Sequence, residues 1–91
     1  MSLATDAAAP FTSLIIVACA DKPGVYEELA EVLEPFTLTI AKVEQIALRG
    51  RLILGVLIEL DPAHALAIEA DLVEFGERTG YDVAMDYSED L

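Results

Sequence analysis

The chain has 91 residues, of which 55% are hydrophobic, and 17 acids against five cations give a formal net charge of −12. This length predicts one domain, and the apolar content argues against disorder. The acidic balance excludes nucleic acids as expected partners and disfavours anionic membrane surfaces, and no apolar run approaches the ~20 residues of a membrane-spanning helix. A single cysteine excludes an internal disulfide and indicates a reducing compartment, so we expect a cytoplasmic protein.

Hydrophobic patterning predicts four strands and two helices. Residues 1–11 are mostly small, and we interpret them as a disordered lead-in or as vector-derived residues ahead of a domain at 12–91. The elements expected, in chain order, are a strand at Thr12–Ala20, a helix at Val25–Glu34, a strand at Leu38–Leu48, a strand at Leu52–Leu60, a helix opened by Asp61–Pro62 and closed by Gly80, a strand at Tyr81–Tyr87 and an acidic tail at Ser88–Leu91.

Three local features of these elements can be predicted from residue type. The alternation of the second strand slips, which indicates a β-bulge near residues 42–45. Arg49 and Gly50 favour a tight hairpin turn in which the glycine supplies the positive φ. Leu66 and Val73 lie away from the apolar stripe of the second helix, so we expect them to be exposed or at a partner surface.

The element order β-α-β-β-α-β defines the expected fold class. With right-handed crossovers it closes as an α+β, ferredoxin-like sandwich, in which a four-stranded antiparallel sheet carries both helices on one face. The first and third strands are apolar and should be central. The second and fourth contain charged residues and should be the edges, as Lys42, Glu44, Asp82 and Asp86 indicate.

The turn between the first strand and the first helix is the candidate binding site. Asp21 can accept hydrogen bonds from the free N–H groups that open the helix. Pro23 fits a first helical turn, and Gly24 allows close approach of a ligand or of another backbone. Outward-pointing N–H groups in such a turn suit a carboxylate. The alternative is a turn that only connects a strand to a helix.

No catalytic or metal-binding set of residues can be recognised. His64 is the only histidine and has no cysteine or paired carboxylate nearby, so we interpret it as a solvated helix residue. Cys19 is interpreted as a buried apolar residue. A phosphate loop, a dinucleotide fingerprint and a nucleophile elbow are all missing from the sequence. We therefore expect no catalytic residues and no cofactor in this chain.

The motifs resemble those of a known family. A β-α-β-β-α-β domain with Asp-x-Pro-Gly at Asp21–Gly24 resembles the ACT domains, small modules that bind amino acids and regulate metabolic enzymes. Residues Val43–Leu52 and Leu54–Leu57 are similar to the first ACT domain of bacterial phosphoserine phosphatases that carry two such domains ahead of a haloacid-dehalogenase catalytic domain. Gly80–Met85 and Ser88–Asp90 are similar to the end of that domain.

The resemblance implies a ligand seat between two domains. Turn N–H groups would hold the carboxylate of the ligand, and Asp21 would hold its ammonium. Relatives commonly have asparagine where this chain has Lys42, and a lysine cannot accept a hydrogen bond from an ammonium, although it can hold a carboxylate. The implied seat comprises Asp21, Lys22, Pro23, Gly24 and Val25 of one domain with Lys42 and Val43 of its partner.

The resemblance also implies a function. The chain would be a regulatory domain, binding an amino acid such as L-serine, within a phosphoserine phosphatase of L-serine biosynthesis, and it would form a homodimer through ACT–ACT pairing. The parent hydrolase would use Mg²⁺ in its catalytic domain. The alternative is a structural dimerisation module that binds no ligand. A third reading, an independent small enzyme or metal-binding protein, is disfavoured because paired acid/base or ligand residues are missing.

Overall fold

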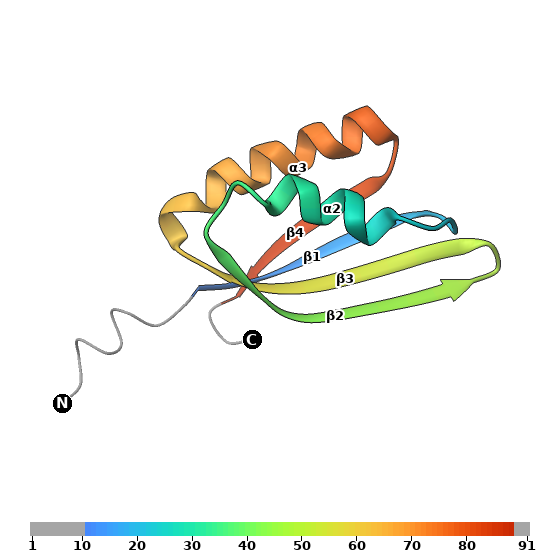
Figure 1. Ribbon diagram of the computed structural model, residues 1–91, viewed down its shortest axis with the longest axis horizontal. Helices are drawn as coiled ribbons and strands as arrows, with labels where there is room; N and C mark the ends of the chain where they lie inside the picture. Colours follow the sequence, from blue (N-terminus) through green and yellow to red (C-terminus); the bar gives the residue numbers. More distant parts are fainter. Residues whose placement is uncertain (1–10, 89–91) are drawn as a thin grey trace.

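Four strands form one antiparallel sheet, and both helices pack on the same face of it in the computed structural model, which describes residues 11–88 (Figure 1). The first ten residues and most of the predicted acidic tail lie outside that range. Phe11, assigned above to the lead-in, begins the first strand. The elements are β1 (Phe11–Ala20), α2 (Val25–Leu33), β2 (Leu38–Leu48), β3 (Arg51–Leu60), the 3₁₀ helix η1 (Pro62–His64), α3 (Ala65–Thr79) and β4 (Asp82–Ser88).

The strand order is β2-β3-β1-β4, which confirms the ferredoxin-like prediction. The apolar strands β1 and β3 are central, and the charged strands β2 and β4 are the edges. Ile15 pairs with Val56 of β3 on one side and with Met85 of β4 on the other. No helix among residues 11–88 is long and apolar enough to cross a membrane.

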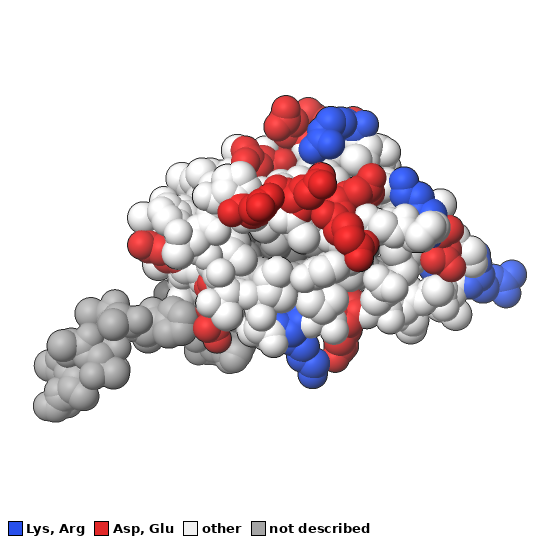
Figure 2. Space-filling model, in the orientation of Figure 1, with Lys and Arg blue, Asp and Glu red and all other residues white. Residues whose placement is uncertain are grey.

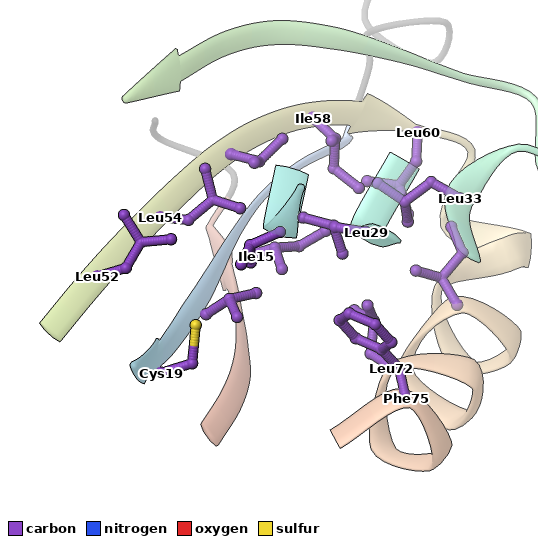
Figure 3. Close-up of a cluster of buried hydrophobic side chains, with 14 residues drawn as sticks. Ile15, Cys19, Leu29, Leu33, Leu52, Leu54, Ile58, Leu60, Leu72 and Phe75 are labelled. Atoms are coloured by element: carbon purple, nitrogen blue, oxygen red, sulfur yellow. The ribbon is translucent and has the colours of Figure 1, made fainter. Parts of the chain in front are cut away.

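The core lies between the sheet and the two helices (Figure 3). Alternate residues of β1 and β3 point toward the helices, as expected for strands with one face in the core. Ser13 is the buried polar exception, and its hydroxyl donates to the Asp86 carbonyl oxygen across 2.9 Å. The buried apolar residues are Ile15, Val17 and Cys19 of β1, Val25, Leu29 and Leu33 of α2, Leu52, Leu54, Val56, Ile58 and Leu60 of β3, and Ile68, Leu72 and Phe75 of α3.

Strand β2 contains the predicted bulge, displaced by one residue toward its start. Ile40 pairs with Ile58 and Lys42 with Leu57, so Ala41 is the extra residue. Beyond the bulge, Lys42 shares the sheet face opposite the helices with Leu57. The bulge therefore decides which β2 side chains face the helical layer.

The turns and helix ends follow their residue types. Arg49 and Gly50 both have positive φ, 53° and 79°, which corresponds to the hairpin turn that matches strand twist. The Asp61 carboxylate accepts from the Ala63 N–H across 2.9 Å, and Gly80 ends α3 with φ 80°. Leu66, at 79% exposure, and Val73, at 55%, lie on the solvent side of α3, as predicted.

Candidate ligand-binding site

A backbone hydrogen bond holds the turn that follows β1 in place. The N–H of Asp21 donates to the carbonyl oxygen of Gly50 across 3.0 Å, which ties this turn to the β2–β3 hairpin (Figure 1). Gly24 is the N-cap of α2 with φ 87°, and no side chain caps the helix. The prediction that Asp21 accepts hydrogen bonds from the helix N–H groups is therefore wrong. A left-handed residue at the N-cap turns the chain sharply, and the Asp21 side chain is left exposed.

A shallow groove opens between this turn and β2. It is lined by residues 22–27 of the turn and the first turn of α2, and by Val43 and Gln45 of β2. The N–H of Glu28 is the first to bond within the helix, to the Gly24 carbonyl oxygen at 3.0 Å. The preceding N–H groups have no intrahelical acceptor, because every α-helix begins with such unpaired donors. The groove thus combines a helix N-terminus with two polar residues, Glu27 and Gln45.

Most of the residues predicted for the site lie at the groove, but two do not. Lys22, Pro23, Gly24, Val25 and Val43 line it together. The two that do not line the groove are Asp21 and Lys42.

Lys42 lies on the opposite face of the sheet. Its Nζ is 3.2 Å from Glu44 Oε2, and both side chains are exposed. Adjacent residues of a strand point to opposite faces, so Lys42 and Val43 cannot line one groove of the same domain.

Glu27 and Gln45 also line the groove, and the sequence alone did not predict them there. Glu27 was not among the residues predicted for the site. Gln45 was treated only as part of the predicted bulge. The bulge at Ala41 sets the phase that points Gln45 toward the helices, in register with Leu54. A bulge predicted at Ala41, one residue earlier, would have placed Gln45 on the sheet face that the helices cover.

A second polar cluster lies beside the same turn. The hydroxyl of Tyr81 donates to Glu28 Oε1 across 2.6 Å, and Lys22 Nζ lies 5.0 Å from the centre of the Tyr81 ring. Burial, and then the bond to Glu28, raise the pKa of Tyr81. The contact with Tyr81 raises the pKa of Lys22. At neutral pH the turn therefore presents a charged ammonium beside a neutral phenol.

Two titratable side chains outside the groove, those of Cys19 and His64, are fully or partly buried. Cys19 is a buried free thiol, and burial raises its pKa above the ordinary value. His64 is half-buried instead of solvated, and its Nδ1 has no hydrogen-bond partner within residues 11–88. Across the same residues, no group of three or more histidine, cysteine or acidic side chains could hold a metal ion.

Acidic side chains gather over the two helices (Figure 2).

The sheet, the two helices on one face and the groove at the first turn define a βαββαβ domain of the ferredoxin-like class. Residues 12–86 match the family model of the ACT domain, and the chain belongs to this family.

Known proteins support this placement. The chain is 42% identical over 80 residues to phosphoserine phosphatase SerB2 of Mycobacterium tuberculosis, covering 86% of this chain and 20% of that protein. It therefore spans about a fifth of the length of this relative. A formyltetrahydrofolate deformylase from Pseudomonas syringae pv. tomato superposes with a TM-score of 0.75 at 15% identity, covering 89% of this chain and 28% of that one.

An ACT domain protein from Streptococcus pneumoniae superposes with a TM-score of 0.68 at 17% identity, over 87% of this chain and 91% of that one. At such identities the two structures show the shared fold alone. The fold class and the family are thus established independently of any ligand.

Proposed function

We propose that this ACT domain is the amino-acid-sensing regulatory domain of a phosphoserine phosphatase of L-serine biosynthesis, and that its ligand is L-serine. The observation that carries the proposal is the 42% identity to SerB2 over 86% of the chain. The parent enzyme would hydrolyse O-phospho-L-serine with Mg²⁺ in a separate catalytic domain. Sensing its end product would let such an enzyme respond to the supply of serine.

The groove has the groups that a small zwitterion needs. The free N–H groups at the start of α2 suit the α-carboxylate of the ligand. Glu27 lines the same groove and suits its ammonium, the role that the resemblance gave to Asp21. The Gln45 amide can donate to or accept from a side-chain hydroxyl, as serine requires.

Pairing of two ACT domains is part of the same proposal. Strand β2 is an edge strand of 11 residues, and all its residues after Leu38 are exposed. An edge this long offers unpaired N–H and C=O groups to a second strand. A homodimer joined through β2 would also cover the open side of the groove. Since Cys19 is a free thiol, we place this assembly in the reducing cytoplasm.

The second candidate function is a pairing module that binds no ligand. The observation in its favour is the position of Lys42, which lies on the face away from the groove. In this reading β2 joins two domains and the turn after β1 is only a connection.

Amide NMR during an L-serine titration of the 91-residue chain separates the two, with glycine and L-aspartate as control ligands. Saturable shifts at Lys22, Gly24, Val25 and Gln45 with L-serine alone are expected. Glu27→Gln should weaken binding at least tenfold, whereas Glu31→Gln, an exposed site further along α2, should not. A folded chain that shows no shift up to millimolar L-serine would favour the pairing module.

A further inference from the structure

One tyrosine joins the turn at the candidate site to the connection between α3 and β4. The hydroxyl of Tyr81 donates to Glu28 Oε1 of α2 across 2.6 Å, although the two residues are 53 positions apart in the chain. The ring of the same tyrosine lies against the turn after β1, with Lys22 Nζ 5.0 Å from the ring centre. The turn and the α3–β4 connection lie at the same end of the molecule (Figure 1).

Tyr81 is held in place by α3, independently of its contacts with α2. Its ring packs edge-on against Phe75, with the ring centres 5.6 Å apart. Its N–H donates to the Thr79 hydroxyl across 3.2 Å, and that hydroxyl donates to the Phe75 carbonyl oxygen across 2.7 Å. A Cβ at Gly76 would lie only 3.2 Å from the Tyr81 carbonyl oxygen, so the backbone is closely packed as well. Tyr81 is therefore a fixed point to which neighbouring groups can be attached.

The two contacts of Tyr81 bracket the segment that forms one wall of the groove. Residues 22–27 line the groove, and Tyr81 contacts the side chains at positions 22 and 28. Glu28 also closes the first turn of α2, since its N–H donates to the Gly24 carbonyl oxygen across 3.0 Å. Tyr81 and Glu28 do not line the groove themselves. They act on the groove only through the position of its wall.

We propose that Tyr81 is a positioning residue for the groove, holding the wall at residues 22–27 and coupling its occupancy by a ligand to the start of β4. The coupling rests on the proposed function, since it needs a ligand in the groove, whereas the position of the wall does not. Coupling between two sites is reciprocal. If the held wall favours the ligand, the bound ligand must favour the Tyr81 contacts by the same free energy.

The hydrogen bond between Tyr81 and Glu28 suits this role. Its length of 2.6 Å is typical of a hydroxyl bonded to an ionised carboxylate, a bond about twice as strong as one between neutral groups. Both residues are half-buried, so water competes less for the bond than it would at an exposed position. Loss of the hydroxyl would leave the Glu28 carboxylate without this donor and should release the start of α2.

Tyr87 provides a matched control within the same chain. Its hydroxyl donates to Glu69 Oε1 across 3.1 Å, so it also bonds a carboxylate of a helix. It lies near the other end of β4, where it pairs with Ser13, and neither Tyr87 nor Glu69 lines the groove. A change from tyrosine to phenylalanine removes one hydroxyl at either position and keeps the ring. Only the change at Tyr81 should affect the groove.

The first test is amide hydrogen exchange in the ligand-free 91-residue chain. Tyr81→Phe should speed the exchange of the Glu28 amide, which is bonded to Gly24, by about fivefold or more. Tyr87→Phe should leave the rate within about twofold of wild type. Equal rates for the Glu28 amide in the two variants would overturn the proposal, whether or not the chain binds L-serine.

The second test adds L-serine and measures the reciprocal effect. Saturating L-serine should shift the amide resonances of Tyr81 and Asp82 in the wild-type chain, although neither residue lines the groove. Tyr81→Phe should weaken binding by about fivefold or more, and Tyr87→Phe by less than about twofold. Glu28→Gln keeps an acceptor for the Tyr81 hydroxyl and should bind nearly as wild type does, whereas Glu28→Leu should bind as weakly as Tyr81→Phe.

The outcomes separate this inference from the proposed function. A wild-type chain that binds no L-serine would overturn the proposed function and the coupling with it, while hydrogen exchange would still decide whether Tyr81 holds the wall. If L-serine binds but leaves the Tyr81 and Asp82 resonances unmoved, or binds both tyrosine variants equally well, the coupling is overturned and the proposed function stands.

Discussion

The Asp21 N–H donates to the carbonyl oxygen of Gly50 across 3.0 Å, and this bond joins the turn at the candidate site to the hairpin between β2 and β3. Gly50 follows Arg49, and both have positive φ. The conformation of the hairpin therefore positions the acceptor that holds the turn at the start of the candidate groove. We therefore expect a substitution in the hairpin to alter the conformation of the turn at the candidate site.

Substitution of the hairpin glycine should test this connection. Gly50→Ala should lower the free energy of unfolding by about 1 kcal/mol or more, because a Cβ is disfavoured in the left-handed region. Arg49→Gly should stay within about 0.5 kcal/mol of wild type, since relief of strain offsets the added freedom of the unfolded chain. Urea unfolding measures both. Gly50→Ala should also shift the Asp21 amide resonance, and an unmoved resonance would contradict the coupling.

The aromatic core can be tested at Phe75, which is 1% exposed and packs edge-on against Tyr81. Phe75→Ala should lower the free energy of unfolding by about 3–5 kcal/mol, through lost burial and the cavity left behind. Val73→Ala, on the exposed side of the same helix, should change it by less than about 0.5 kcal/mol. Similar losses for the two variants in denaturant unfolding would mean that α3 packs with another face inward.

Alanine substitution should change the free energy of unfolding in opposite directions at Gly76 and at Gly55. At Gly76 a Cβ would lie 3.2 Å from the Tyr81 carbonyl oxygen and 3.4 Å from a methyl of Val83, so the α3–β4 contact must open. Gly76→Ala should destabilise by about 1–3 kcal/mol, as overpacking does. Gly55→Ala, with its nearest atom at 3.9 Å, should be neutral or stabilising by about 0.5 kcal/mol. Thermal unfolding at low protein concentration, where self-association is minimal, compares them. The same sign for both would contradict this packing.

Alkaline pH should destabilise the fold through its tyrosines. Burial and bonds to Glu28 and Glu69 raise the pKa of Tyr81 and Tyr87 above the ordinary value of 10.0. Above pH 10 the unfolded chain loses these protons before the folded chain does. The free energy of unfolding should therefore fall as pH rises from 10 toward the folded-state pKa, and it should be unaffected by these groups below pH 10.

Urea unfolding between pH 8 and pH 11 measures this slope. Tyr81→Phe should flatten it, and a further Tyr87→Phe should flatten it more. A slope identical in all three chains would assign the alkaline loss to other groups, of which Cys19 is the first candidate because burial raises its pKa.

Local features were predicted well wherever short-range chemistry decides them. Asp61 caps its helix and Gly80 ends it, as their residue types indicate. The Asp21 prediction failed because a positive φ at Gly24 made the glycine the N-cap, and side-chain chemistry alone does not report that conformation. Gln45 was not predicted to line the groove because the extra residue that sets the phase of β2, Ala41, lies one position before the predicted bulge.

The sequence by itself determined the order of strands and helices, the apolar centre of the sheet, the hairpin and the family. These depend on periodicity and on turn residues within a few positions of one another. Only the tertiary structure decided which β2 side chains face the groove and that the Asp21 N–H binds Gly50. These relationships depend on the register between strands far apart in the chain, which is set when the whole sheet closes over its core.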